Sequence, residues 1–241
     1  MIGHVTIRGI ELLAVPNQTQ FVDFLLNHGD IRTGKLVAIN AEKVIISEQN
    51  PQLRRLLHNT EYKYADGISI VCAIKRKYPQ HRQVERIAGV ELWEAMLMAG
   101  IAYDLPVFLV GGKPDVLAET AEKLCRLGVR IVGSQDGYFT AEDQDSVIER
   151  IRQSGAKFVS VAMGSPKQEM FIESAQQIYP DTLYMGVGGS YDVFVGKVKR
   201  APQIWRQLGL EWLFRLWQQP TRWQRQLRLM KYAYYYLTKQ L

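Results

Sequence analysis

Residues 107–114 have the sequence VFLVGGKP, in which four consecutive apolar residues precede two glycines, a lysine and a proline. A short run of consecutive apolar residues is typical of a strand that is covered on both faces of its sheet. Proline is favoured in the first turn of a helix, because a backbone N–H at that position has no intrahelical partner. This stretch therefore predicts a buried strand, a tight turn and the start of a helix.

The same order of strand and helix recurs on both sides of this stretch. Strands are predicted at 5–15, 36–39, 107–110, 130–133, 158–162 and 183–187, and helices at 17–27, 51–59, 90–101, 114–127, 142–153 and 166–178. This alternation predicts an α/β fold with a Rossmann-like, mostly parallel sheet flanked by helices. After residue 196 the strand signals stop, so we expect a Rossmann-like domain at residues 1–196 and a helical C-terminal appendage at residues 197–241.

The charge of the chain is divided unevenly between these two parts. The formal net charge is +6, but residues 1–196 hold 20 basic and 23 acidic side chains, whereas residues 197–241 hold ten basic side chains and one acidic side chain. Four of the five tryptophans also lie in the second part, at positions 205, 212, 217 and 223. The sequence thus predicts a near-neutral body and a basic, aromatic appendage with a net charge of +9.

The composition excludes several classes of protein. With 47% apolar and 22% charged residues, the chain is globular and not disordered. No apolar run approaches the roughly 18–20 residues that span a bilayer, and the first residues do not resemble a secretory signal. We therefore expect a cytoplasmic protein. Cys72 and Cys125 lie far apart in helix-like segments, so we expect two reduced, buried thiols and no disulfide or zinc site.

Glycines follow three of the predicted strands, and ligands bind beyond the carboxyl ends of strands in sheets of this kind. Glycine lets a backbone approach a ligand closely, and the N-terminus of the following helix offers free N–H groups to an anion. We predict that these exits form one site for a phosphate-containing ligand, although each could be an ordinary tight turn. Neither a P-loop nor a dinucleotide fingerprint is present. The exit residues are Gly111, Gly112 and Lys113, then Gly164 and Gln168, then Gly188 and Asp192.

Two polar residues follow segments in the N-terminal half. Asn40 comes after the strand at 36–39, and Asp66 comes after residues 62–65. An aspartate at such a position could act as a general base, and a helix cap or a turn is the alternative role. The four histidines have no metal-binding spacing, so no metal site is expected.

The appendage has an amphipathic helical pattern. Arg215, Arg222 and Arg225 lie beside an apolar face, with Arg228 and Lys231 beyond them. An apolar face with interfacial aromatic residues beside basic residues is typical of a helix that binds an anionic membrane surface. A helix that packs its apolar stripe on the core, and a basic face that binds nucleic acid, are the alternatives. The apolar face comprises Trp212, Leu216, Trp223, Leu227, Met230, Tyr234 and Leu237.

Six motifs, in order, resemble the WecG/TagA/CpsF glycosyltransferase family. They are VAINAE at 37–42, YADG at 64–67, VGGKP at 110–114, DGYF at 136–139, GSPKQE at 164–169 and GVGGSYD at 186–192. The segments LEWLFR at 210–215 and PTR at 220–222 are similar to the C-terminal pattern of the family. The resemblance extends from about residue 5 to residue 230.

The resemblance implies an inverting glycosyltransferase that needs no metal or other cofactor. Such enzymes move an aminosugar from a UDP donor to N-acetylglucosamine on undecaprenyl diphosphate, at the inner face of the cytoplasmic membrane. By resemblance, Asp66 is the general base and Asn40 lines the same pocket, while Arg215, Arg222 and Arg225 complete the site and stabilise the leaving diphosphate. The residues expected to bind substrate are Gly111, Gly112, Lys113, Tyr138, Gly164, Gln168, Gly188 and Asp192.

Within the family, the segment AINAEK at 38–43 and the appendage are most similar to members that transfer N-acetyl-D-mannosaminuronic acid. Their product is lipid II of enterobacterial common antigen synthesis. Teichoic-acid members, which transfer N-acetylmannosamine, commonly carry Thr at the position of Ala38 and Pro at that of Ala41. Transfer of N-acetylmannosamine and a non-catalytic nucleotide-binding module are the alternative functions. We expect no nucleic-acid partner, and the apolar stripe also suits association into a homo-oligomer.

Overall fold

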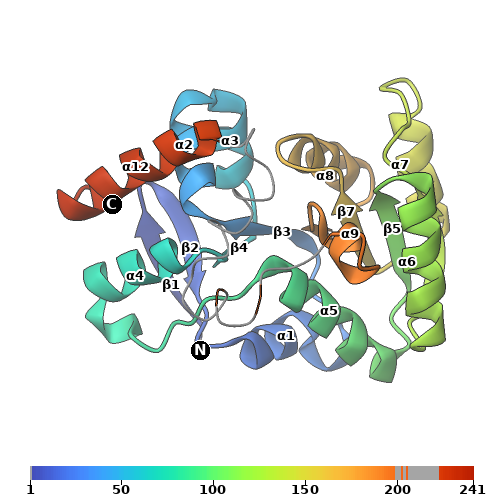
Figure 1. Cartoon of the computed structure of the whole chain (residues 1–241). Helices are drawn as coiled ribbons and strands as arrows, with labels where there is room; N and C mark the ends of the chain where they lie inside the picture. Colours follow the sequence, from blue (N-terminus) through green and yellow to red (C-terminus); the bar gives the residue numbers. More distant parts are fainter. Residues whose placement is uncertain (1, 199–201, 203–204, 206–222) are drawn as a thin grey trace.

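A six-stranded, fully parallel sheet forms the centre of the chain (Figure 1). The structure is a computed structural model that describes residues 2–198, 202, 205 and 223–241. The predicted α/β fold with a parallel sheet and flanking helices is confirmed. In the order β4-β3-β8-β7-β5-β6, the strands are β4 (Tyr62–Ala65), β3 (Gly34–Ile39), β8 (Leu183–Gly186), β7 (Phe158–Ala162), β5 (Val107–Gly111) and β6 (Ile131–Gln135).

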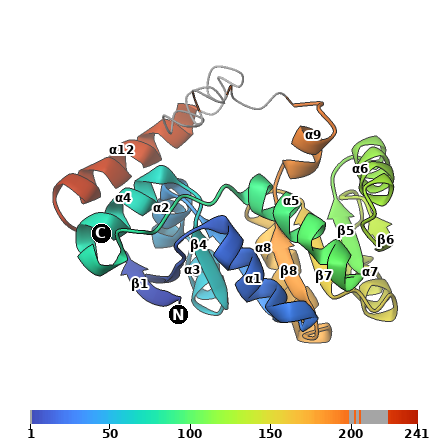
Figure 2. The ribbon, with the colours of Figure 1, turned by 90° about the horizontal axis from the view of Figure 1, so that it is seen from below.

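Helices cover both faces of the sheet, as Figures 1 and 2 show. Val107 and Leu109 of β5 pack with one set of helices, whereas Phe108 and Val110 pack with the other set. Because both faces of the sheet are covered, the sequences of the central strands are continuous runs of apolar residues. The first set is α1 (Gln18–Leu26), α5 (Gly89–Gly100) and α6 (Pro114–Arg126), and the second contains α7 (Gln144–Gln153) and α8 (Lys167–Ile178).

The strand order creates a switch point between β5 and β7. Strand β5 is followed by β6 on one side, whereas β7 is followed by β8 on the other side. The connections after these two neighbouring strands therefore diverge, which is where open α/β sheets form their ligand-binding crevice. Gly111 and Ala162, which end these strands, pair with each other in the sheet.

One predicted strand is wrong, because residues 5–15 form a hairpin. Strands β1 (Gly3–Ile7) and β2 (Ile10–Ala14) pair antiparallel in a separate two-stranded sheet. Arg8 and Gly9 reverse the chain with φ values of 50° and 77°. Apolar residues lie on both sides of this two-residue turn, so the sequence pattern resembles that of a single long strand.

Two helices that the sequence did not predict follow β3 and β4 directly. Helix α2 (Ala41–Gln49) begins after Asn40, whose side chain caps it, and α4 (Ile68–Lys77) begins after Gly67. Asn50 ends α2 and caps α3 (Pro51–His58), so two helices succeed each other within one connection.

The prediction of buried thiols is also wrong. Cys72 on α4 and Cys125 on α6 are free, as expected, but both are exposed. Each cysteine lies at a helix position that faces solvent, and a helical pattern alone does not decide which face of the helix is buried.

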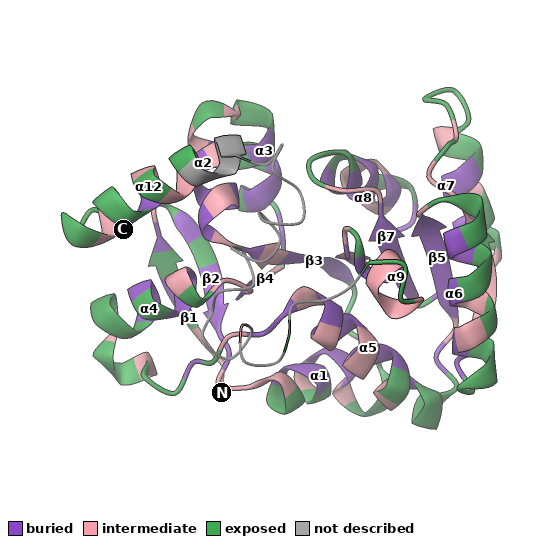
Figure 3. Cartoon of the chain, in the orientation of Figure 1, coloured by how far each residue is buried: buried purple, intermediate pink, exposed green. Residues whose placement is uncertain are grey.

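Helix α12 (Trp223–Leu237) lies against α2 and exposes its outer face (Figures 1 and 3). The exposed fractions of Leu227, Met230, Tyr234 and Leu237 are 57%, 68%, 58% and 72%. For these four residues the alternative of an apolar stripe packed on the core is wrong. Trp212 and Leu216 lie outside the described residues, and so does the side chain of Trp223. Within the described part of the chain, no helix has the length and apolar character needed to cross a bilayer.

Candidate active site

Asp66 and Asn40 lie side by side at the C-terminal ends of the neighbouring strands β4 and β3. The backbone N–H of Asp66 donates to the carbonyl of Ile39 at 3.0 Å, which extends the pairing of the two strands. A Cβ atom added to Gly67 would lie 3.5 Å from the Cβ atom of Asn40. The parallel sheet therefore brings together two residues that the resemblance assigns to one pocket.

Asn40 has a structural role in addition to any role in catalysis. Its Oδ1 atom accepts the backbone N–H of Lys43 at 2.9 Å and so caps α2. Capping fixes the side-chain orientation, because an N-cap oxygen must face the free N–H groups of the first turn. The amide group of Asn40 is thus held at a defined position beside Asp66.

The first residue of α5 and the segment before it hold Asp66 in place. Gly89 donates its backbone N–H to Asp66 Oδ1 at 3.2 Å, and Arg86 Nε donates to the carbonyl oxygen of Asp66 at 2.7 Å. The Tyr64 hydroxyl is fully buried nearby; burial raises its pKa well above the usual value, and the charge of Asp66 raises it further. Arg86 and Gly89 carry no local sequence signal that connects them with Asp66, which lies 20 and 23 positions away.

The glycine-rich exits of β5 and β7 meet at the switch point. Gly111 has a φ of +100°, and a Cβ atom added to it would lie 2.4 Å from the carbonyl oxygen of Ala162. The next residue, Gly112, donates its N–H to that same oxygen at 2.9 Å. Only glycine fits this close approach of two backbones. Gly164, with a φ of +74°, continues the chain just beyond Ala162.

Three other predicted substrate-binding residues surround Gly112. The Gly112 carbonyl accepts the N–H of Gly137, which places the exposed Tyr138 beside this turn. A Cβ atom on Gly112 would lie 3.2 Å from the ring of Tyr191, the residue before Asp192. Lys113 is the N-cap of α6. The structure thus gathers Lys113, Tyr138 and Asp192 around one tight turn.

Gln168 connects the two groups of residues. It is buried, its Oε1 atom accepts the N–H of Gly188 at 3.0 Å, and its Nε2 atom donates to Glu169 Oε1 at 3.2 Å. The same Glu169 oxygen accepts Lys43 Nζ at 2.8 Å. Because Lys43 lies in the first turn of α2, these bonds join the exits of β3, β7 and β8.

The Lys43–Glu169 ion pair is almost completely buried, with side-chain exposures of 10% and 1%. Burial by itself would raise the pKa of Glu169, but the Lys43 ammonium outweighs this effect and lowers the pKa. A buried charge of this kind needs its partner, because desolvation of an unpaired ion is costly. The pair therefore keeps Glu169 ionised between the exits of β3 and β7.

The predicted arginines of the appendage are described only in part. Arg215 and Arg222 lie outside the described residues, and Arg225 lies in α12 without a described side chain. Arg228, one turn later, donates to Glu42 Oε1 in the first turn of α2 at 2.8 Å, whereas Lys231 donates to Glu48 Oε2 in its last turn at 2.8 Å. Helix α12 thus runs in the same direction as α2, and its N-terminal end lies at the end of α2 that carries Asn40.

The candidate site is elongated. Asp66 at β4 and Gly111 at β5 are separated by four strand-to-strand steps of about 4.8 Å, or roughly 19 Å along the edge of the sheet. Such a length suits an extended ligand better than a compact one. Among the described residues, no group of three or more His, Cys, Asp and Glu side chains is placed to hold a metal ion.

Fold and loops together define a doubly wound α/β protein in which polar and glycine-rich residues gather at the C-terminal edge of the sheet. The family model described as "Glycosyl transferase WecG/TagA/CpsF family" matches residues 5–241. The chain belongs to the WecG/TagA/CpsF glycosyltransferase family. It is therefore a glycosyltransferase, with a sugar donor and a lipid-linked acceptor as its general substrates.

Proposed function

We propose that this glycosyltransferase moves N-acetyl-D-mannosaminuronic acid from UDP to N-acetylglucosaminyl-diphospho-undecaprenol, which yields lipid II of enterobacterial common antigen. The observation that carries the proposal is the shared edge of Asp66, Asn40 and the glycine turns. An extended nucleotide sugar fits along this edge, with its nucleoside end at Gly111 and Gly112 and its sugar beside Asp66.

In this reaction the Asp66 carboxylate takes the proton from a hydroxyl group of the acceptor N-acetylglucosamine. The hydroxyl oxygen then forms a bond to the anomeric carbon of the donor sugar. The bond from that carbon to the β-phosphate oxygen breaks, and its electron pair leaves with UDP. One displacement of this kind inverts the anomeric centre. The contact from Gly89 to Oδ1 orients the carboxylate for proton transfer.

Negative charge that develops on the leaving diphosphate requires preorganised cations or N–H donors. We assign this role to Arg215, Arg222 and Arg225, with Lys113 at the N-terminus of α6. Support comes from the direction of α12, whose N-terminal end lies at the end of α2 that carries Asn40. The guanidinium group suits a diphosphate, since it donates two parallel hydrogen bonds.

We further propose that the appendage binds the inner face of the cytoplasmic membrane, where a lipid-linked acceptor resides. The exposed face of α12 carries Leu227, Met230, Tyr234 and Leu237, and residues 197–241 have a net charge of +9. An apolar face within a basic segment is attracted to anionic lipids and inserts between their headgroups. The division into a catalytic domain at 1–196 and a membrane-associating appendage at 197–241 belongs to the same proposal.

A donor panel tests the proposed function. Full-length protein is incubated with N-acetylglucosaminyl-diphospho-lipid and, in turn, UDP-N-acetylmannosaminuronic acid, UDP-N-acetylmannosamine and UDP-N-acetylglucosamine. We expect a disaccharide lipid with the first donor and much slower transfer with the others. Faster transfer of N-acetylmannosamine would assign the teichoic-acid type of activity instead, and UDP binding without transfer to any acceptor would favour a non-catalytic module.

A further inference from the structure

Glu48, in the last turn of α2, accepts hydrogen bonds from two other parts of the chain. Arg8, in the turn between β1 and β2, donates from Nε at 3.0 Å and from Nη2 at 2.6 Å to Oε1. On α12, Lys231 Nζ donates to Oε2 at 2.8 Å and the Tyr235 hydroxyl donates to it at 3.2 Å. One carboxylate thus joins the hairpin, α2 and α12.

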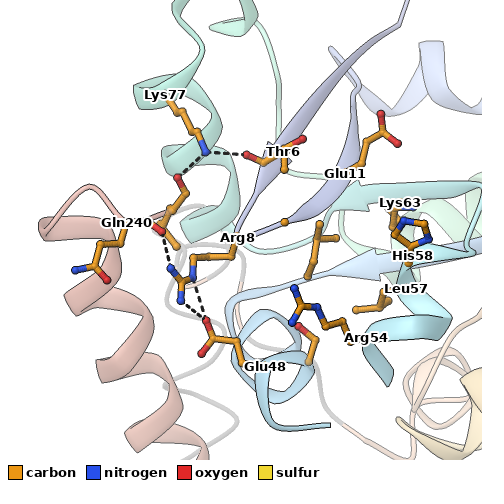
Figure 4. Close-up of a pocket in the computed structure, with 14 residues that line it drawn as sticks. Thr6, Arg8, Glu11, Glu48, Arg54, Leu57, His58, Lys63, Lys77 and Gln240 are labelled. Carbon is orange, nitrogen blue, oxygen red and sulfur yellow. Dashed lines mark hydrogen bonds and ion pairs between the residues drawn. The ribbon is translucent and has the colours of Figure 1, made fainter. Parts of the chain in front are cut away.

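Arg8 reinforces the same junction. Its Nη1 atom donates to the carbonyl of Gln240 at 3.0 Å, and its guanidinium lies 4.1 Å from the ring centre of Tyr235. Figure 4 shows Arg8 between Glu48 and Gln240, at the side of a cavity of about 850 Å³. The cavity leaves space for the Arg8 side chain to move away once Glu48 no longer holds it.

Helix α12 also contacts α4. The Tyr232 hydroxyl donates to the carbonyl of Ser69 at 3.3 Å, and Arg76 Nη1 donates to the carbonyl of Tyr236 at 2.7 Å. Ser69 lies in the first turn of α4 and Arg76 in its last turn. Helix α12 therefore spans both α2 and α4, which are the two helices that begin after Asn40 and after Asp66-Gly67.

Resting on the proposed function, we propose that Glu48 is a positioning residue, which holds α12 on α2 so that the N-terminal end of α12 stays beside the loops of Asn40 and Asp66. The side chain of Glu48 is only 21% exposed, so solvent screens its ion pairs incompletely. Without its charge, the cations Arg8 and Lys231 would face each other across a neutral side chain. Mutual repulsion would then release α12 at the end remote from the active site, and the helix would lose its alignment.

The test is the substitution Glu48→Gln in the full-length protein. We expect faster hydrogen exchange of the α12 amides and a kcat that falls by about 10-fold to 100-fold, because catalytic rates are sensitive to small misplacements. UDP affinity should fall less than kcat, since Gly111 and Gly112 lie on other elements and bind UDP without α12. A Glu48→Asp protein keeps the charge and should recover part of the turnover.

Glu149→Gln is the matched control. Glu149 accepts two hydrogen bonds from Arg152, at 2.7 and 2.6 Å, but both residues lie within α7. In Glu149→Gln, we expect the hydrogen exchange of the α12 amides and the kcat to equal those of the wild type. Lys231→Met breaks the junction from the α12 side and should reproduce the effect of Glu48→Gln in a weaker form, since Tyr235 remains.

Three results would overturn the positioning role. The first is unchanged hydrogen exchange of the α12 amides in Glu48→Gln, and the second is faster exchange with unchanged kcat. A loss of UDP affinity equal to the loss of kcat would also contradict it, because a general structural defect affects both. If the wild type transfers no sugar to any lipid-linked acceptor, the proposed function itself fails, and this is evident before any variant is measured.

Discussion

At the scale of single residues, Asp66 is the most direct test of the chemistry. In Asp66→Asn, the amide oxygen can still accept the N–H of Gly89, so the loop should keep its conformation. A general base contributes about 10²-fold to 10⁴-fold to a rate, and we expect kcat to fall by this amount while UDP binding is retained. Transfer assays and UDP-induced shifts in melting temperature measure the two effects. Wild-type turnover in this variant would exclude Asp66 as the base.

Asp104→Asn is a suitable control for that substitution. Asp104 is an exposed partner of Arg130 and precedes β5, so it lies at the opposite edge of the sheet. Its replacement removes one carboxylate without touching the candidate site. Its turnover should match that of the wild type.

The Lys43–Glu169 pair makes a prediction about stability. Lys43→Met leaves a buried carboxylate without its cation, which costs about 3–5 kcal/mol of unfolding free energy. Replacing both residues by methionine should cost much less, because no charge is then buried. Urea denaturation of the two variants and the wild type measures the difference. Equal losses in both would contradict the ion pair as the cause.

The same pair has a pH dependence of defined sign. The folded-state pKa of Glu169 is lowered, so the pair stabilises the protein above the ordinary carboxyl pKa, and this contribution is lost as the pH falls through the lowered value. In Lys43→Met, the ammonium no longer opposes the effect of burial, so the pKa of Glu169 rises and protonation removes the unpaired charge. We therefore expect the difference in unfolding free energy between the wild type and Lys43→Met to become smaller at acidic pH. A difference that does not change with pH would refute this explanation.

At the scale of elements, the sequence predicts those strands and helices whose local pattern agrees with their environment. The run at 158–162 is β7 as predicted, because consecutive apolar residues suit a strand covered on both faces. Helix α2 was missed, because its buried face includes Lys43 and Ser47, and a polar residue on a buried face obscures the helical period. Likewise, nothing local connects Lys43 with Glu169, which lies 126 positions away. The order of the strands in the sheet decides which of the loops after the strands lie next to each other. The local pattern of a single sequence does not show this order.

The close approach of the β5 and β7 exits gives a prediction at this scale. Gly111→Ala places a Cβ atom against the Ala162 carbonyl and disturbs its hydrogen bond from Gly112. We expect an unfolding free energy lower by about 3 kcal/mol or more, from a positive φ and a steric clash together, and weaker UDP binding. Gly155→Ala is the control, since Gly155 has a φ of +66° with no neighbour within 4 Å of the added atom. It should lose only about 1–2 kcal/mol and keep its UDP affinity. Equal losses in the two variants would show that backbone conformation, and not the approach of the strands, is responsible.

At the scale of the whole molecule, α12 has two faces with different surroundings. Arg228, Lys231, Tyr232 and Tyr235 face α2 and α4, whereas Leu227, Met230, Tyr234 and Leu237 face solvent (Figure 3). The inner face is held by ion pairs and by apolar contacts, since Tyr232 belongs to a buried cluster and Leu229, Tyr235 and Tyr236 pack against that cluster. The outer face still exposes large apolar side chains, which orients it for a surface outside the protein. The net charge of +9 in residues 197–241 favours an anionic surface.

The substitutions Met230→Glu and Leu237→Glu, made together, test this orientation. Both side chains are exposed, so the fold and its melting temperature should be unchanged. If each side chain enters the membrane, its loss removes about 1.5–3 kcal/mol of apolar burial, and we expect affinity for vesicles that contain phosphatidylglycerol to fall at least about tenfold. Leu127→Glu with Ile178→Glu is the matched control, because these residues are 49% and 42% exposed on the body. Vesicle co-sedimentation should separate the two pairs. Equal binding by the α12 pair and the wild type, or an equal loss in the control pair, would mean that the exposed face of α12 is not the membrane-binding surface.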